Sequence, residues 1–210
     1  MSILLMGCVR GLASEGDWVK NTISEHRPDA VGISISKESL QAMAQHYELG
    51  GDLPEPANFE EEMYIEGISQ YGEVIRPPPC FSEAWRVAEK RGITLMALDM
   101  DDEHFTAAFC KHISGLEIIR QGRCNNKWAR HTFTAKNPKE FVLEWDRMIN
   151  WLPGYKNLEK AREDWIAKGI SKLSEEHGSV LVVVEYERLA GVRNSLEELG
   201  KEYQTLESDN

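Results

Sequence analysis

Polar and charged side chains follow the apolar runs of this sequence, at the points where strands are predicted to end. Arg10 and Ser34 follow the first two runs, Asp99 follows a third, and Glu187 and Arg188 follow the last. If these strands are parallel, their carboxyl ends meet at one edge of a sheet, where α/β proteins place their sites. Guanidinium groups form paired hydrogen bonds with carboxylate and phosphate oxygens. An anion site is therefore one interpretation of the pattern.

The elements that must position these side chains alternate along the chain. β-Branched and apolar runs predict strands, and segments with a period of 3.6 residues predict helices. The predicted strands cover residues 3–6, 30–35, 93–98 and 180–184. The predicted helices cover residues 17–27, 36–47, 81–91, 136–151, 158–176 and 192–203. This alternation predicts a single α/β domain over residues 1–210, with a central, mainly parallel sheet of four or more strands flanked by helices. A helical insertion is expected at about residues 50–91.

Several short motifs resemble the TraB/PrgY family, which belongs with the erythromycin-esterase-like, ChaN-like and Tiki proteins. Family members begin with Gly-x-x-His after the first strand, continue with an "RPD-V-VE-L" segment, and carry an "ERD-x-YMA" helix and a closing "VVVGAGHLxGI". The corresponding segments of this chain are Gly7-Cys8-Val9-Arg10, Arg27-Pro28-Asp29-Ala30-Val31-Gly32-Ile33-Ser34, Ala161-Arg162-Glu163-Asp164-Trp165-Ile166-Ala167 and residues 182–192. The resemblance covers most of the chain and implies the same α/β fold.

This chain departs from the family at its polar positions. The resemblance implies that two histidines and a glutamate hold a divalent metal or otherwise carry out hydrolysis. Arg10, Ser34 and Arg188 stand at those positions, whereas Arg162 is retained. A guanidinium is permanently protonated and has no lone pair to donate, so an arginine cannot replace a histidine ligand. We therefore expect no metal and no other cofactor at this place.

Two interpretations of the arginines remain open. Arg10, Arg162 and Arg188 could line a retained pocket for an anion or a peptide, with Ser34, Asp99 and Glu187 around it. Alternatively, Glu185 and Glu187, which are acids next to Arg188, could neutralise the cations internally and fill a dead site.

The acidic run from Asp99 to His104 and the thiol of Cys8 are further candidates for chemistry. Alternate carboxylates could bind Mg²⁺ or Ca²⁺, but Asp101 or Asp102 is expected to cap a helix that continues to Cys110. Cys8 has no histidine at a spacing that would pair with it, and no GxSxG motif is present. We expect Cys8 to be a small buried residue.

Residues 111–136 form a basic segment with a net charge of +5, whereas the remainder of the chain carries −16. Trp128, His131 and Phe133 lie among its basic residues, a composition that could stack bases. The acidic remainder favours docking of this segment on the chain's own surface or on a second copy.

Composition narrows the classes of function. The 24 basic and 35 acidic residues give a net charge of −11, which argues against binding nucleic acid or an anionic membrane over the whole surface. No apolar run approaches the roughly 20 residues of a membrane-spanning helix. The four cysteines form no CxxC pair, and a reducing cytoplasm is expected.

The sequence thus predicts a cytoplasmic, TraB-like binding or interaction module, not a metallohydrolase. Its expected partners are a small anion or a peptide, or a second copy of the chain; a membrane is not expected, and nucleic acid is disfavoured. The alternative is a hydrolase with altered chemistry, in which Asp99, Asp101 or Glu187 acts as general base. A third interpretation is a structural subunit that joins a partner through the basic segment.

Overall fold

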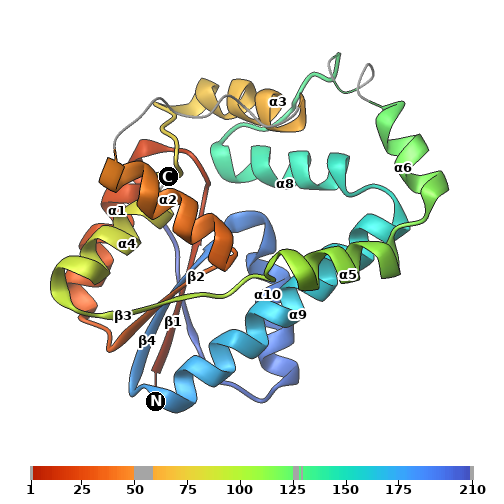
Figure 1. Ribbon diagram of the computed structural model, residues 1–210. Helices are drawn as coiled ribbons and strands as arrows, with labels where there is room; N and C mark the ends of the chain where they lie inside the picture. The colour runs from red at the N-terminus through yellow and green to blue at the C-terminus, as the bar shows by residue number, and fades with distance from the viewer. Residues whose placement is uncertain (1, 50–58, 125–127, 129, 209–210) are drawn as a thin grey trace.

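Five parallel strands form the centre of the described part of the chain (Figure 1). The computed structural model describes residues 2–49, 59–124, 128 and 130–208. Its strands are β1 (Ser2–Cys8), β2 (Ala30–Ile33), β3 (Thr94–Ala97), β4 (Ser179–Glu185) and β5 (Gln204–Leu206). Their order across the sheet is β3-β2-β4-β1-β5, and every pairing is parallel. The predicted α/β fold with a parallel sheet is therefore confirmed.

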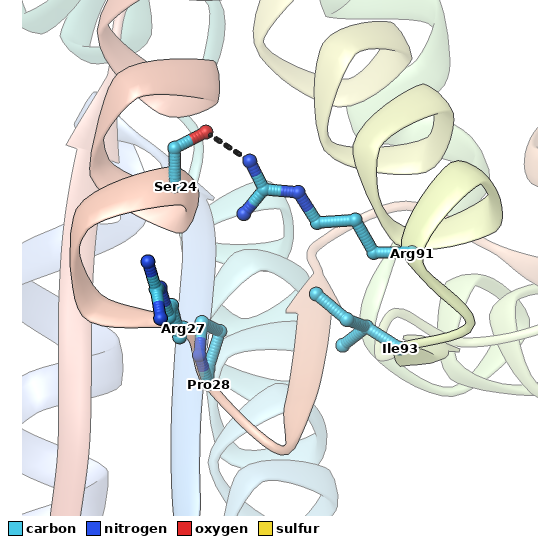
Figure 2. Close-up of a pocket in the computed structure, with 5 residues that line it drawn as sticks. All are labelled: Ser24, Arg27, Pro28, Arg91 and Ile93. Atoms are coloured by element: carbon cyan, nitrogen blue, oxygen red, sulfur yellow. Dashed lines mark hydrogen bonds between the residues drawn. The ribbon is translucent and has the colours of Figure 1, made fainter.

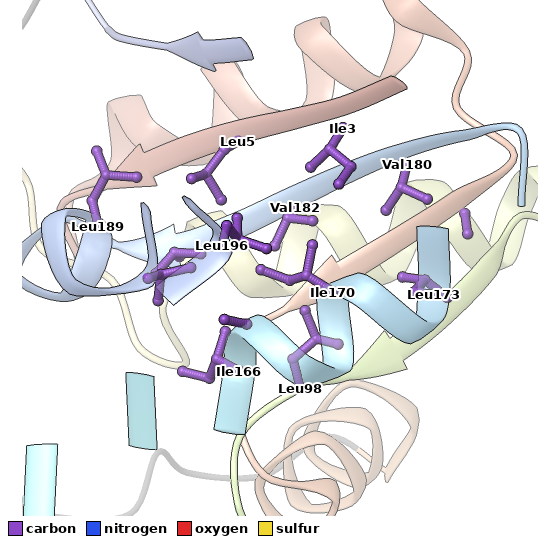
Figure 3. Packing of buried hydrophobic residues seen from close by; sticks show 14 residues of the cluster. Ile3, Leu5, Leu98, Ile166, Ile170, Leu173, Val180, Val182, Leu189 and Leu196 are labelled. Atoms are coloured by element: carbon purple, nitrogen blue, oxygen red, sulfur yellow. The ribbon is translucent and has the colours of Figure 1, made fainter. Parts of the chain in front are cut away.

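Helices cover both faces of the sheet because the buried strands are apolar on both sides. Along β4, Val180, Val182 and Val184 pack into one cluster, whereas Leu181 and Val183 pack into the opposite one. The first cluster is closed by α9 (Pro153–Glu176) and α10 (Tyr186–Glu198), and Figure 3 shows its side chains between these helices and the strands. The second is closed by α1 (Ala13–His26), α2 (Lys37–Leu49) and α4 (Pro79–Arg91).

A further group of helices lies beyond the carboxyl ends of the strands. α3 (Phe59–Ile68) and α8 (Pro138–Ile149) pack together there, followed along the chain from α3 by the short 3₁₀ turn η1 (Ser69–Tyr71) (Figure 1). Tyr64 and Phe141 of these helices share an apolar cluster with Val9 and Leu12, which follow β1. This cluster fixes α3 directly over the edge of the sheet where the polar strand-end residues stand.

The connection between β3 and α8 contains two more described helices. α5 (Asp102–His112) packs against α9, and α6 (Gly115–Gly122) follows it. Asp101 caps α5, because its side chain accepts a hydrogen bond from the backbone N–H of His104. The predicted capping role of this acidic run is thereby confirmed for Asp101.

Three features of the fold differ from the expected elements. The last helix covers Tyr186–Glu198 instead of residues 192–203, so Glu187 and Arg188 belong to its first turn. α6 lies inside the basic segment, and β5 adds a strand after the last helix. In the expected insertion, residues 50–58 lie outside the described residues, and α3, η1 and α4 occupy the remainder. No helix among the described residues is long and apolar enough to cross a membrane.

Candidate functional site

A cavity of about 630 Å³ opens at the carboxyl edge of the sheet. Arg10 after β1, Ile35 after β2 and Glu185 at the end of β4 line its strand side. Residues of α2, α3 and α4 and of the segment before α4 form the opposite wall, which includes Met43, Tyr64, Ile65, Val74 and Phe81. A concave, mainly apolar space at this edge is the usual location of a ligand site in an open parallel sheet.

A second pocket lies at the opposite edge of the sheet, before β2 and β3. Figure 2 shows Arg27 and Pro28, with Arg91 and Ile93 across from them, and the guanidinium of Arg91 donates to Ser24 Oγ at 2.8 Å. Both of its arginines are exposed to solvent. None of the strand-end residues that the sequence singled out lines this pocket.

Arg188 is held between two carboxylates. Its Nε lies 2.9 Å from Glu159 Oε2, and its Nη1 lies 2.7 Å from Glu185 Oε1. The second oxygen of Glu185 accepts a hydrogen bond from the hydroxyl of Ser34. The carboxylate expected to neutralise Arg188 internally is therefore present, and Ser34 links it to the end of β2.

Arg162 is held in the same way. Its Nη1 lies 2.9 Å from Glu159 Oε1, and its Nε and Nη2 donate to the carboxylate of Asp99. Glu159 thus bridges the two arginines. The contacts form one line of alternating charge, which ends at the hydroxyl of Ser34: Asp99, Arg162, Glu159, Arg188, Glu185 and Ser34. The donors that these guanidiniums use here are not available to a ligand unless the line breaks.

Arg10 is in a different situation. Its guanidinium lies over the ring of Tyr64, 4.7 Å from the ring centroid, and the Tyr64 hydroxyl donates to the Arg10 carbonyl at 2.9 Å. Among the described residues, no carboxylate oxygen lies within 4.0 Å of this guanidinium. Arg10 is half-buried and lines the cavity. Of the three predicted arginines it is the one in contact with this space.

Glu187 carries a buried oxygen, Oε2, that has no hydrogen-bond partner among the described residues. Burial raises the pKa of Glu187 to about 7, and the charge of Glu185 adds to the rise. The positive charges of Arg10 and Arg188 act in the opposite direction without cancelling it. The carboxyl therefore changes its charge near neutral pH.

The bridging acid Glu159 shows the opposite shift. Burial opposes its ionisation, but the charges and hydrogen bonds of Arg188 and Arg162 outweigh burial and lower its pKa to about 2. The pKa of Glu185 is also lowered: burial raises it, and Arg188 and the Ser34 hydrogen bond more than compensate. Glu159 and Glu185 are thus ionised at neutral pH, whereas Glu187 is only partly ionised.

All six predicted site residues lie at this edge of the sheet, but in two groups. Ser34, Asp99, Arg162 and Arg188 belong to the line of charges, whereas Arg10 faces the cavity, and Glu187 acts electrostatically on Arg10. Two central residues were not predicted. Glu159 had a sequence signal, because it precedes Arg162 by one helical turn. Tyr64 had none, since its place depends on how α3 packs over the sheet.

The other candidates for chemistry have structural roles. Cys8 is fully buried as predicted, and burial raises the pKa of its thiol. In the basic segment, Trp128 is buried, Phe133 packs against Phe141 and Trp145, and His131 Nε2 lies 2.9 Å from Glu144. These rings are used in packing and do not form an exposed stacking surface. Within the described ranges, no group of three or more His, Cys, Asp or Glu side chains could hold a metal ion.

No family model matches the chain, and no curated protein matches it. The resemblance to the TraB/PrgY family therefore stays a prediction.

The bridging role of Glu159 predicts a large loss of stability on Glu159→Gln. The substitution leaves two partly buried guanidiniums short of a countercharge, so we expect the free energy of unfolding to fall by about 2–4 kcal/mol at pH 7. Urea unfolding followed by circular dichroism measures it. The control is Glu83→Gln, which removes a pair with the exposed Arg86 and should cost no more than about 0.5 kcal/mol. Equal losses in the two variants would contradict the bridging role.

The raised pKa of Glu187 predicts that Glu187→Gln becomes progressively more stable than wild type as pH rises. An acid whose pKa is higher in the folded state binds more protons there, so its contribution to stability is present below its unfolded pKa of about 4.5 and is lost as pH rises through about 7. The stability difference between variant and wild type should grow by about 1–3 kcal/mol between pH 5 and pH 8.

Urea unfolding at a series of pH values checks this prediction. Glu175→Gln is the control: the hydrogen bond from Lys201 lowers the pKa of Glu175, so its contribution changes below about pH 5. That variant should follow wild type from pH 5 to pH 8. A stability difference for Glu187→Gln that does not vary over the same range would refute the prediction.

Proposed function

We propose that this protein is a non-catalytic binding module that holds a small organic anion, or the carboxylate of a peptide, in the cavity at the carboxyl edge of the sheet. One observation carries the proposal. Arg10 is a half-buried cation on the wall of a mainly apolar cavity, and no described carboxylate lies within ion-pair distance of it. Burial lowers the pKa of Arg10, but Tyr64 and the charges of Glu187 and Glu185 outweigh burial and raise it. Because these acids act from beyond ion-pair distance, no described carboxylate contacts the guanidinium, and an anionic ligand could bind it.

The line of charges supports the same proposal from the other side. Because Arg162 and Arg188 are each bound by two carboxylates, they contribute to the site by holding the strand ends in place. In this proposal Arg10 contacts the ligand, whereas the other two arginines position the edge of the sheet. The module would then be a TraB-like domain that lacks the metal chemistry of that family.

We place this module in the cytoplasm. All four cysteines are free thiols, and Cys8 and Cys80 are buried within the same apolar cluster without being joined. Unjoined thiols are typical of proteins in a reducing compartment.

Removal of the Arg10 charge should abolish anion-dependent stabilisation. The melting temperature of the whole chain is measured with and without millimolar phosphate, succinate or octanoate. At least one of these anions should raise the melting temperature of wild type, and Arg10→Met should remove the increase because its countercharge is gone. Arg123→Met, which changes an exposed arginine at the end of α6, should keep it. Equal increases in wild type and Arg10→Met would rule the proposal out.

The state of Glu187 favours a second function, a hydrolase in which this carboxylate is the general base. The structure separates the three acids predicted for that role: Asp99 is bound by Arg162, and Asp101 caps α5. Glu187 has a buried oxygen without a partner and a pKa of about 7, which suits a general base at neutral pH.

Hydrolysis of p-nitrophenyl butyrate between pH 5 and pH 9 tests this second function. A general base at Glu187 predicts a rate that rises with pH through about 7 and falls at least about 100-fold in Glu187→Gln. Glu163→Gln is the matched control, because burial also raises the pKa of Glu163 to about 7. Neither acid lines the cavity itself, but Glu187 interacts electrostatically with Arg10 on the cavity wall. Equal rates in the two variants would exclude Glu187 as the base.

A further inference from the structure

We infer that the ligand of the cavity is a monocarboxylic acid with an apolar body, whose carboxylate binds Arg10 and whose body lies along the apolar wall. This inference rests on the proposed function and names the class of ligand. It follows from three properties of the cavity: the composition of its wall, the charged groups that line it and its size.

The apolar residues that line the cavity come from several elements. Ile35 follows β2, Met43 belongs to α2, Ile65 to α3 and Phe81 to α4, and Val74 lies in the segment between α3 and α4. Apolar side chains contributed from five places surround the space, so a ligand without an apolar body would leave them exposed to water. Each methylene group that a ligand buries against such a wall tightens binding about fourfold.

Of the described charged side chains that line the cavity, Arg10 is the one without a carboxylate at contact distance, although the charges of Glu187 and Glu185 act on it from farther away. Glu185 is bound by Arg188 and Ser34, and Arg76 faces Glu61 with 3.9 Å between Nη1 and Oε1. Arg10 has no such carboxylate among the described residues. A second negative charge on the ligand would therefore lie near Glu185 without a cation of its own, which favours one carboxylate over a dianion.

The remaining polar groups of the wall do not call for another ligand charge. The hydroxyl of Tyr64 donates to the Arg10 carbonyl, and the ring of His46 packs edge-on against Tyr47 with 5.5 Å between centroids. An ammonium ligand would be repelled by Arg10. A volume of about 630 Å³ lies within the range for a small-molecule site, so the cavity has room for an acid with a medium-length chain.

Calorimetric titration of the whole chain with a matched series of ligands tests the inference. Butyrate, hexanoate and octanoate differ only in length, whereas 1-octanol and octylamine keep the octyl chain without the carboxylate. Succinate and phosphate supply negative charge without an apolar body. We expect affinity to rise about fourfold per methylene from butyrate to octanoate, with no measurable binding of octanol, octylamine, succinate or phosphate.

Two variants with matched controls locate the ligand. Arg10→Met should abolish octanoate binding, and Arg123→Met should leave it unchanged. Ile65→Ser should weaken octanoate at least severalfold and flatten the dependence on length, because Ile65 is half-buried on the cavity wall. Ile118→Ser, at an exposed position on α6, should leave both unchanged. Circular dichroism confirms that each variant is folded.

The outcomes separate this inference from the proposed function. If succinate or phosphate binds through Arg10 while chain length has no effect, the ligand class is wrong and the anion site stands. If the binding of none of these anions depends on Arg10, both the inference and the proposed function are overturned. If octanoate binds equally to wild type and Arg10→Met, the carboxylate is not recognised, and both are again overturned. N-acetyl-leucyl-leucine is titrated in parallel to distinguish the C-terminal carboxylate of a peptide from a free acid. If either ligand binds through Arg10, a monocarboxylic acid with an apolar body is upheld as the ligand class.

Discussion

The structure depends on a line of alternating charges at the carboxyl edge of the sheet. Burying an ionised group is costly unless an opposite charge and hydrogen bonds compensate it, and here each arginine of the line contacts two acids. Glu159 forms ion pairs with both arginines, and their charges lower its pKa to about 2 although burial raises it. Because the members come from β4, α9, α10 and the segments that follow β2 and β3, the line fixes the relative positions of elements that are distant in the sequence.

This arrangement changes the meaning of the arginines. Taken as isolated residues after predicted strands, three arginines suggest three donors for one anion. In the structure, two of them are countercharges of buried acids, and one is left facing a cavity. The two interpretations drawn from the sequence, a retained pocket and internal neutralisation, are therefore compatible, because they apply to different arginines. Neutralisation at Arg162 and Arg188 keeps the edge of the sheet rigid, and rigidity preorganises a pocket beside it.

The sequence was informative where local pattern determines structure. Apolar runs located β1, β2, β3 and β4, and helix periodicity located α1 and α9, because burial on one or both faces imposes these patterns. It failed for β5, whose three residues carry too little pattern, and for the start of α10, where Tyr186, Glu187 and Arg188 resemble a polar loop. The polar members of the site were predictable as strand ends. The apolar wall of the cavity was not, since Met43, Ile65 and Phe81 are brought together only by the packing of three helices.

Glu187 shows how the two halves of this edge interact. It follows Glu185 by two residues, and the charge of Glu185 raises its pKa while Arg10 and Arg188 lower it. Arg188 is already engaged by Glu159 and Glu185, so Arg10 is the remaining cation that Glu187 shares with the cavity. An anion bound to Arg10 would add negative charge beside Glu187 and favour its protonated form. Ligand binding to Arg10 and proton uptake by Glu187 would then be linked, because the Arg10 guanidinium interacts with both. The charges of Arg188 and Arg162 act on the neighbouring acid Glu159 in the same way and keep it ionised.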